Sequence, residues 1–365
     1  MDDVLEQLDL LRRTERRVAM ATLVAAKGTT PKKEGAKMWV GEGGRILGSV
    51  TIGGCVDARV IEEAERALSK GQRVLLTLSL GDDDAWEIGL TCGGTVDVLV
   101  EPIDLTGDGD VALRAYETAR AEIALGRGAV IVTPLDAGDG RLVVREDGSS
   151  DGTLGSAALD ASALREAAAL LRSGASAVRT LDASGSPRAV FLERLGPRPT
   201  VIVHGATQVA MTLVTLAKAI GMRVIVVDGR ERFATRARFP DADEIRIGMP
   251  SEIAAELPST ATTAIVLVAH DYKYELPVLR HALRSDAGYV GMLGNRKRGA
   301  AVKQLLADEG FTDAELARVH TPIGLDIGAV STAEIALSIL AEIVATRREV
   351  RATSRSSPPV AAARA

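Results

Sequence analysis

The chain has 365 residues, of which 46% are hydrophobic and 25% are charged, as in an ordinary folded globular protein. Its formal net charge of −5 provides no basic surface for nucleic acid or an anionic membrane, which favours small-molecule or protein partners. Because no apolar run is long enough to span a bilayer and the N-terminus lacks a signal-peptide pattern, the sequence predicts a cytoplasmic protein.

The first half of the chain has the pattern of a mixed α/β domain. Apolar residues recur at helical spacing in four segments, which are 2–14, 56–69, 110–125 and 157–172. Short runs with β character are expected to form strands at 18–24, 37–40, 45–48, 74–78, 96–100, 129–133, 141–144 and 189–193. Residues 146–156 are polar and predict a loop, and the acidic residues 82–84 predict a turn.

The sequence Gly196-Pro197-Arg198-Pro199 breaks regular structure and separates a predicted N-terminal domain, 1–196, from a C-terminal domain, 197–348. Strands and helices alternate in the second domain, which predicts a Rossmann-like, doubly wound parallel sheet. The expected strands are 201–204, 223–227, 245–247, 264–269 and 289–293, and the expected helices are 209–220, 276–283, 297–308 and 333–347. Residues 349–365 lack periodicity and predict a disordered tail.

The two cysteines of the chain each lie beside a pair of glycines. Gly53-Gly54 precedes Cys55 at a predicted strand-to-helix junction, where free helix amides attract anions and favour a thiolate. Gly93-Gly94 follows Cys92. One interpretation makes both thiols small buried groups in tight turns. The other has them facing a large ligand, which the glycines allow to come close.

A damaged dinucleotide fingerprint follows the first strand of the second domain. Gly205 begins the turn, but Thr207 occupies the place of the second glycine. Asp228 ends the next strand, where such folds bind a ribose. The motif therefore indicates NAD(P) binding, or else a simple turn in which Asp228 caps the backbone or pairs with Arg230.

Three further motifs are expected at the same edge of the parallel sheet. His270 and Asp271 follow the strand 264–269. Gly294 precedes a helix start with three consecutive basic residues, Arg296 to Arg298, which predicts a phosphate cradle or a solvated helix N-terminus. The loop 320–328, which contains Asp326, is rich in glycine and apolar residues and is more typical of a functional loop than of a connector.

These motifs together resemble the XdhC/CoxI family, the maturation proteins for xanthine dehydrogenase and carbon monoxide dehydrogenase. The resemblance extends in family order from about residue 15 to residue 347, through Gly53-Gly54-Cys55-Val56-Asp57, 89–94, His270-Asp271, 291–294 and 322–328. Two positions depart from the family pattern. The Rossmann loop usually reads Gly-x-Gly-His and here reads Gly205-Ala206-Thr207-Gln208, and Asp57 replaces a common Glu.

The resemblance implies a chaperone without turnover of its own. Such a protein binds molybdenum cofactor, which is molybdopterin with or without a nucleotide, and hands it to an apo molybdoenzyme. It also implies a homodimer and a cysteine desulfurase as a further partner. The cofactor-binding residues expected on this basis are Gly53, Gly54, Cys55, Asp57, Cys92, Gly93, Gly94, Gly205, Asp228, His270, Asp271, Gly294, Arg296 and Asp326, with Cys55 and Cys92 as the thiols nearest the metal.

Two other functions are compatible with the residues. An NAD(P)-dependent oxidoreductase would use the C-terminal domain, with Asp228 selecting NAD. A scaffold or regulator that has lost ligand binding would explain Thr207. Four histidines and two cysteines without a His-x-x-x-His pattern predict no zinc site.

Overall fold

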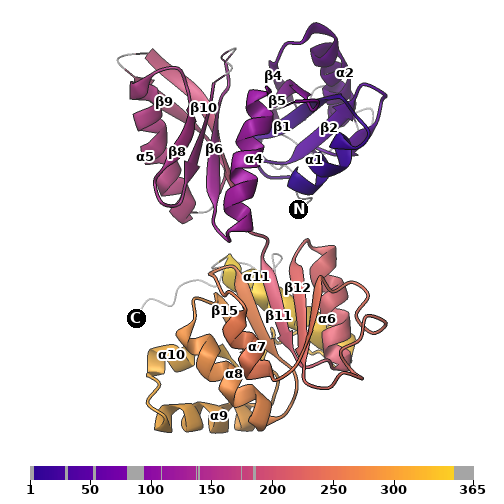
Figure 1. Cartoon of the computed structure of the whole chain (residues 1–365), viewed down its shortest axis with the longest axis vertical. Helices are drawn as coiled ribbons and strands as arrows, with labels where there is room; N and C mark the ends of the chain where they lie inside the picture. Colours follow the sequence, from indigo (N-terminus) through magenta and orange to yellow (C-terminus); the bar gives the residue numbers. More distant parts are fainter. Residues whose placement is uncertain are drawn as a thin grey trace. The chain divides into compact units, whose positions relative to one another are not determined.

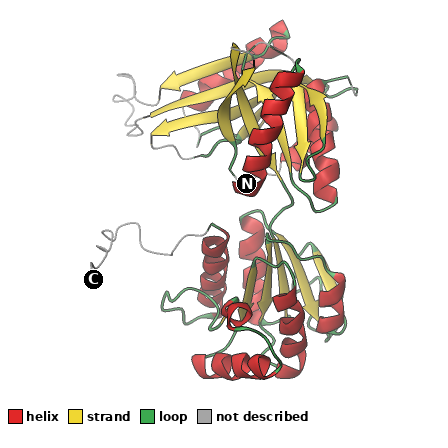
Figure 2. Cartoon of the chain, turned by 90° about the vertical axis from the view of Figure 1, so that its left-hand side faces the viewer, coloured by secondary structure: helices red, strands yellow, loops and turns green. Residues whose placement is uncertain are grey.

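The computed structural model describes residues 4–28, 32–51, 55–79, 94–107, 109–136, 138, 140–173, 175–183 and 186–348. The chain divides into two compact units, unit 1 over 1–197 and unit 2 over 198–365 (Figure 1). Strands and helices both occur in each unit (Figure 2). Among the described residues, no helix combines the length and the apolar character that crossing a membrane requires.

Unit 1 contains two five-stranded antiparallel sheets and four described helices. The first sheet has the order β3-β2-β1-β5-β4, with β1 (Arg17–Gly28), β2 (Lys37–Gly41), β3 (Ile46–Gly48), β4 (Val74–Ser79) and β5 (Gly94–Asp104). The second has the order β8-β7-β6-β10-β9, with β6 (Ala129–Pro134), β7 (Arg141–Arg145), β8 (Ser150–Thr153), β9 (Ala177–Ala183) and β10 (Ser186–Leu195). The helices are α1 (Val4–Arg12), α2 (Cys55–Lys70), α4 (Val111–Ala124) and α5 (Ala157–Ser173).

Unit 1 is a tandem repeat of one motif. In the residues that the structure describes, each half runs helix, three strands, helix, two strands, and the two sheets have the same strand order. The register agrees as well, because Glu101 on β5 lies opposite Met20 on β1, and Glu193 on β10 lies opposite Ile131 on β6. We call residues 4–104 repeat 1 and residues 111–195 repeat 2.

The helices of unit 1 pack where their apolar faces require. The helix α2 covers the first sheet through Val60, Ala64 and Ala67, and α5 covers the second sheet in the same way. Between the sheets, α1 and α4 share one core with residues of both repeats (Figure 1). Burial of this shared apolar surface stabilises the two repeats against each other.

Unit 2 is a doubly wound fold around one parallel six-stranded sheet in the order β13-β12-β11-β14-β15-β16. This is the order 3-2-1-4-5-6 of dinucleotide-binding folds. Its strands are β11 (Thr200–His204), β12 (Arg223–Asp228), β13 (Glu244–Ile247), β14 (Thr263–Leu267), β15 (Tyr289–Met292) and β16 (Val319–His320). Its helices are α6 (Gln208–Ala219), α7 (Pro250–Glu256), α8 (Tyr272–Arg284), α9 (Arg296–Asp308), α10 (Asp313–Ala317) and α11 (Thr332–Arg347).

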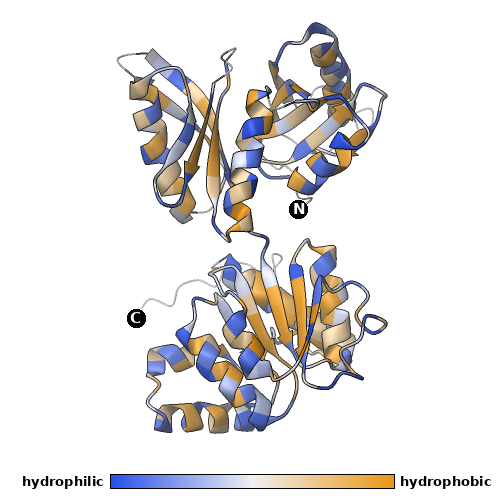
Figure 3. Ribbon diagram, in the orientation of Figure 1, coloured by the Kyte–Doolittle hydropathy of each residue, from blue (hydrophilic) through white to orange (hydrophobic). Residues whose placement is uncertain are grey.

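The helices α6 and α11 cover one face of this sheet, and α8, α9 and α10 contribute to the core on the other. Because both faces are covered, the strands are apolar along most of their length (Figure 3). The expected mixed N-terminal part and Rossmann-like C-terminal sheet are confirmed.

Several short elements differ from the expectation. The predicted loop over 146–156 is wrong, because it contains β8, an edge strand whose four residues are all exposed and therefore lack apolar alternation. The elements β9, α7, α10 and β16 were also not expected from the sequence. The predicted turn at 82–84 and the predicted tail over 349–365 lie outside the described residues.

Candidate functional site

The first thiol begins a helix. Cys55 is the first residue of α2, but its side chain, Gly53-Gly54 and Cys92-Gly93 lie outside what the structure describes. The described flanks still place the two loops. Strands β1, β3 and β4 run in one direction and β2 and β5 in the other. The register places the end of β3 at Gly48 level with Ala21, in the middle of β1, whereas the end of β4 at Ser79 and the start of β5 at Gly94 lie together at one end of the first sheet.

The helix α2 returns from the same end. It follows β3 and leads through a short turn into β4, whose direction matches that of β3. Its length of roughly 24 Å, at 1.5 Å per residue, is close to the roughly 20 Å of β4, at 3.3 Å per residue. The backbone of Cys55 thus starts near the end of the sheet at which the connection containing Cys92 begins and ends.

Comparison of the repeats shows what is special about these two connections. Between β3 and α2 repeat 1 has residues 49–54, whereas between β8 and α5 repeat 2 has only 154–156. Between β4 and β5 repeat 1 has residues 80–93, whereas repeat 2 has 184–185. Both thiols therefore lie in or directly after segments that repeat 1 has extended, and Ala157 begins the helix that corresponds to α2.

Asp57 fixes the chain that leads into the first loop. Its buried carboxylate accepts hydrogen bonds from the Ser49 hydroxyl at 2.5 Å, the Thr51 hydroxyl at 2.8 Å and the Thr51 amide at 3.1 Å. In repeat 2, Asp160 accepts from the Thr153 hydroxyl and the Leu154 amide, both at 2.7 Å. The acid common to both repeats thus anchors the strand-to-helix connection, and in repeat 1 that connection carries the thiol.

Gly94 is required by the sheet. It pairs with Gly28 on β1, and a Cβ at this position would collide with the backbone carbonyl oxygen of Lys27. The absence of a side chain therefore lets β5 pair with β1 up to its first residue. Contact of Gly94 with a ligand stays a prediction.

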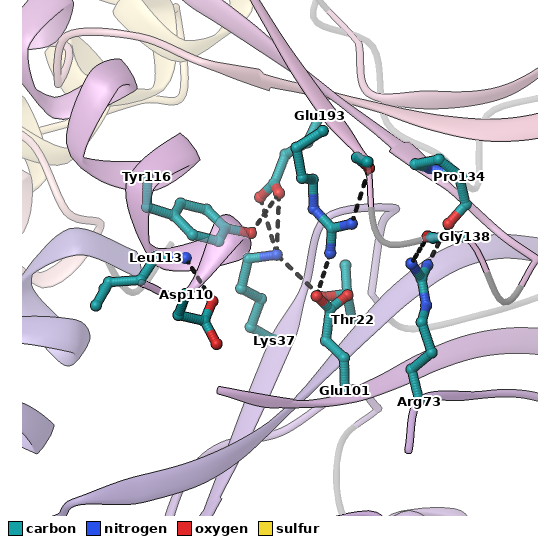
Figure 4. Close-up of polar contacts among 12 residues, drawn as sticks. Thr22, Lys37, Arg73, Glu101, Asp110, Leu113, Tyr116, Pro134, Gly138 and Glu193 are labelled. Atoms are coloured by element: carbon teal, nitrogen blue, oxygen red, sulfur yellow. Dashed lines mark hydrogen bonds and ion pairs between the residues drawn. The ribbon is translucent and has the colours of Figure 1, made fainter. Parts of the chain in front are cut away.

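A network of buried charges joins the two repeats (Figure 4). The Lys37 ammonium lies 3.0 Å from a carboxylate oxygen of Glu193 and donates to the Thr22 hydroxyl at 3.0 Å. The Tyr116 hydroxyl donates to Glu193 at 2.7 Å. Burial, together with the nearby Glu193 charge, raises the pKa of Tyr116 well above its ordinary value, so this hydroxyl keeps its proton.

A second buried pair mirrors the first. Arg141, the first residue of β7, bonds Glu101 on β5, just as Lys37, the first residue of β2, bonds Glu193 on β10. Each repeat thus supplies a base to the acid of the other. Because every charge of the four is paired within the protein, this network joins the repeats and leaves no charge for a ligand.

In unit 2, the residues of the dinucleotide fingerprint contact other residues of the protein. Gly205 has φ +113°, and a Cβ there would lie 2.7 Å from the Ala269 amide nitrogen. The Asp228 carboxylate accepts from the Ala206 amide at 2.7 Å and from the Arg230 amide and guanidinium at 2.8–2.9 Å. Burial alone would raise the pKa of Asp228, but these bonds outweigh it and lower the pKa. Pairing of Asp228 with Arg230 is the second of the two interpretations above.

His270 belongs to a cluster at the end of β14. Its backbone has φ +59°, and its amide donates to Glu275 at 3.0 Å. Arg298 bonds the same Glu275 and lies 3.0 Å from Nδ1 of His270. Burial, with the nearby Arg298 charge, lowers the pKa of His270, which favours a neutral imidazole. Of the three basic residues that open α9, Arg298 is therefore turned inward.

The other predicted residues of this edge have simpler surroundings. Asp271 caps α8 by accepting from the Lys273 amide at 2.9 Å. Gly294 leaves room for the side chain of Arg298. Arg296 and Asp326 are exposed, and neither forms an ion pair with another described residue. The parallel sheet brings these residues and His270 to its carboxyl edge, as the alternation of strands and helices predicts.

One arrangement at this edge was missed. The Glu342 carboxylate on α11 accepts from the Tyr289 hydroxyl at 2.6 Å and the Gly324 amide at 2.7 Å, and lies 3.1 Å from Nδ1 of His320. The rings of Tyr289 and His320 stack with centroids 4.6 Å apart. A signal was present in the sequence, because Glu342 is a lone acid in the helical stripe that includes Ile339.

Comparisons with known proteins match both units. The model of the XdhC and CoxI family matches residues 11–79, and that of the XdhC Rossmann domain matches residues 201–343. A Bacillus subtilis (strain 168) protein that is named as a probable xanthine dehydrogenase subunit is 28% identical over 348 residues, which cover 94% of this chain and 97% of that protein. The molybdenum cofactor insertion chaperone PaoD of Escherichia coli (strain K12) is 27% identical over 329 residues, covering 90% and 83%.

A crystal structure described as a xanthine dehydrogenase from Bacillus halodurans has the same fold. It superposes with a TM-score of 0.76 at 24% identity, covering 97% of this chain and 98% of the other. Sequence and structural similarity thus extend over both units of the chain.

Proposed function

Because the chain belongs to the XdhC and CoxI family, we propose that it is a maturation factor that binds molybdenum cofactor and delivers it to a molybdoenzyme. The recipient would be of the xanthine dehydrogenase or carbon monoxide dehydrogenase type. Similarity to the chaperone PaoD along most of both chains supports this role. A homodimer and a cysteine desulfurase partner belong to the same proposal.

The observation that carries the proposal is the position of the two thiol-bearing connections. Both connections are longer than their counterparts in repeat 2, and α2, which begins with Cys55, returns along the sheet from the side of Ser79 and Gly94. A molybdenum cofactor has a phosphate, a flat pterin and a sulfur-bearing metal. The first turn of α2 offers unpaired amides to a phosphate, and thiolates bind soft metals. When bound, the cofactor would supply the molybdenum centre of the recipient enzyme.

Asp57 has a supporting role in this proposal. Its carboxylate accepts hydrogen bonds from Ser49 and Thr51, so in this proposal it positions the loop before Cys55. Cys55 and Cys92 are the residues proposed to face the metal and its sulfur.

The experiment is to purify the full chain after incubation with saturating molybdenum cofactor and to measure bound molybdenum and pterin. Retention by the wild type and loss in Cys55→Ala are expected. A wild type that retains neither would end the proposal, and a Cys55→Ala variant that binds and transfers cofactor normally would remove the role of this thiol. A short thiol crosslinker that fails to join Cys55 to Cys92 would contradict a shared site.

An NAD(P)-dependent oxidoreductase finds less support, because Asp228 already accepts hydrogen bonds from Arg230 and from the Ala206 amide. Binding a ribose there would require breaking them. Calorimetric titration with NADH tests this alternative, and saturable binding would restore it.

A further inference from the structure

His204, the last residue of the inner strand β11, is buried without a polar partner. Only 2% of the residue is exposed, and among the described residues neither Nδ1 nor Nε2 of its ring has a hydrogen-bond partner. Buried polar side-chain atoms in proteins are almost always paired, because an unpaired one costs free energy on folding. An apolar side chain of similar size would therefore pack at this position at a lower cost.

The alternation of side chains along β11 places the ring on the face that carries α7 and α8. Val203 belongs to the core with α6 and α11, whereas Ile202 packs with Ile253 of α7. Because His204 lies two residues after Ile202, both side chains point to the same face of the sheet. The helices α7 and α8 lie side by side on this face (Figure 1), so they cover the ring.

The acidic groups on the elements around the ring are exposed or paired elsewhere. Glu252 and Glu256 on α7 and Asp271 at the start of α8 are exposed. The two buried acids are Glu275 on α8, which pairs with Arg298, and Asp228 at the end of β12, which pairs with Arg230. The other charged or titratable groups of α8 are bases, and they are Lys273, Arg280, His281 and Arg284.

A proton on the ring is therefore disfavoured in the folded protein. Burial, and then the charge of His281, lowers the pKa of His204 from 6.5 to about 4. If the helices open and water reaches the ring, its pKa returns toward the ordinary value. The neutral ring thus stabilises the closed packing fully above about pH 6.5, and this contribution is lost as the pH falls toward 4.

We propose that His204 makes the packing of α7 and α8 on β11 sensitive to acid, so that protonation of its buried, unpaired ring opens these two helices from the sheet. The helices α6 and α11 cover the opposite face and do not contain this contact. Because α8 begins directly after His270 and Asp271, its opening displaces both residues from the carboxyl edge. The inference concerns unit 2 alone and does not depend on the proposed cofactor site at Cys55.

The test is hydrogen–deuterium exchange of the full chain between pH 8 and pH 5, read by mass spectrometry in peptides from α7, α8, α6 and α11. Division by the intrinsic exchange rate at each pH gives the equilibrium constant for local opening. For α7 and α8 this constant should be about 30-fold larger at pH 5 than at pH 8, from a pKa of 6.5 in the open form and about 4 in the closed form. The peptides of α6 and α11 should change much less.

Three variants assign the effect to His204. His204→Leu should abolish the change in α7 and α8, and His204→Gln, which stays polar but has no charge at any pH, should abolish it too. His281→Gln is the matched control and should retain most of the change, because burial contributes more than the His281 charge. The proposal is overturned if α7 and α8 open equally at both pH values, if either folded His204 variant keeps the dependence, or if α6 and α11 open to the same extent.

Discussion

Replacement of Lys37 by Met should destabilise unit 1 strongly. The substitution keeps most of the side-chain volume but removes the charge that lies 3.0 Å from Glu193. Glu193 would lose its cationic partner in a site where only 6% of its side chain is exposed, with the Tyr116 hydroxyl as its remaining partner. Breaking a buried ion pair from one side costs about 3–5 kcal/mol, and this is the expected loss in the free energy of unfolding.

The assay is urea denaturation followed by tryptophan fluorescence. Both tryptophans of the chain, Trp39 and Trp86, belong to unit 1, so the signal reports that unit alone. Urea is preferred to guanidinium, whose ions would screen the charges. The change in midpoint multiplied by the slope gives the change in free energy.

Two further variants make the test specific. Lys37→Met combined with Glu193→Gln should recover about 2 kcal/mol, because the uncompensated charge is gone and the amide oxygen still accepts from Tyr116. Arg66→Met removes an exposed ion pair on α2 and should change stability by about 0.5 kcal/mol or less. If Lys37→Met costs less than about 1 kcal/mol, the buried pair does not hold the repeats together and the reasoning is refuted.

Three other changes have expected outcomes. Asp57→Ala and Asp160→Ala each remove an anchor of a strand-to-helix connection and should each lower the free energy of unfolding by about 1–2 kcal/mol in urea denaturation. Only Asp57→Ala should also reduce the amount of cofactor that the protein retains. If both variants retain equal amounts, Asp57 has no role in the proposed site. Gly205→Ala should lower the melting temperature, because a backbone φ of +113° disfavours residues with a side chain and the new Cβ would collide with the backbone of Ala269. An unchanged melting temperature would contradict this close contact. The pKa of Asp228 is lower in the folded than in the unfolded protein, so ionised Asp228 stabilises the fold. This contribution to the free energy of unfolding should be complete above about pH 4 and should disappear as the pH falls toward the folded pKa. Asp228→Asn should remove this part of the acid sensitivity, measured by circular dichroism during acid unfolding.

The larger elements were accessible from the sequence because periodicity reflects burial directly. The strand Val201–His204 is an uninterrupted apolar run, and it lies at the centre of the parallel sheet with both faces covered. The strand β8 could not be recognised, because an edge strand with exposed residues has no apolar alternation. Its partner β7 was expected, because its first four residues are buried.

The sequence predicted the candidate sites only in part. Motif spacing indicated the edge at which His270 and Asp271 lie, because strand ends of a parallel sheet meet there. It offered the pairing of Asp228 with Arg230 as one of two interpretations, but it could not show that Arg298 turns inward to Glu275 or that Glu342 contacts His320. These side chains are distant in the sequence, and only the fold brings them into contact, so a single sequence does not predict them.

The reciprocal ion pairs of unit 1 have the form of an isologous dimer interface, in which residue i of one half meets residue j of the other and the reverse. Here a single chain supplies both halves. In a symmetric dimer every substitution occurs twice, but within a fused pair it occurs once, so the halves are free to specialise. Repeat 2 has short connections, while repeat 1 has long ones, with Cys92 within one and Cys55 directly after the other. The fused pair therefore has one such thiol-bearing end per chain, where a homodimer of identical repeats would necessarily have two.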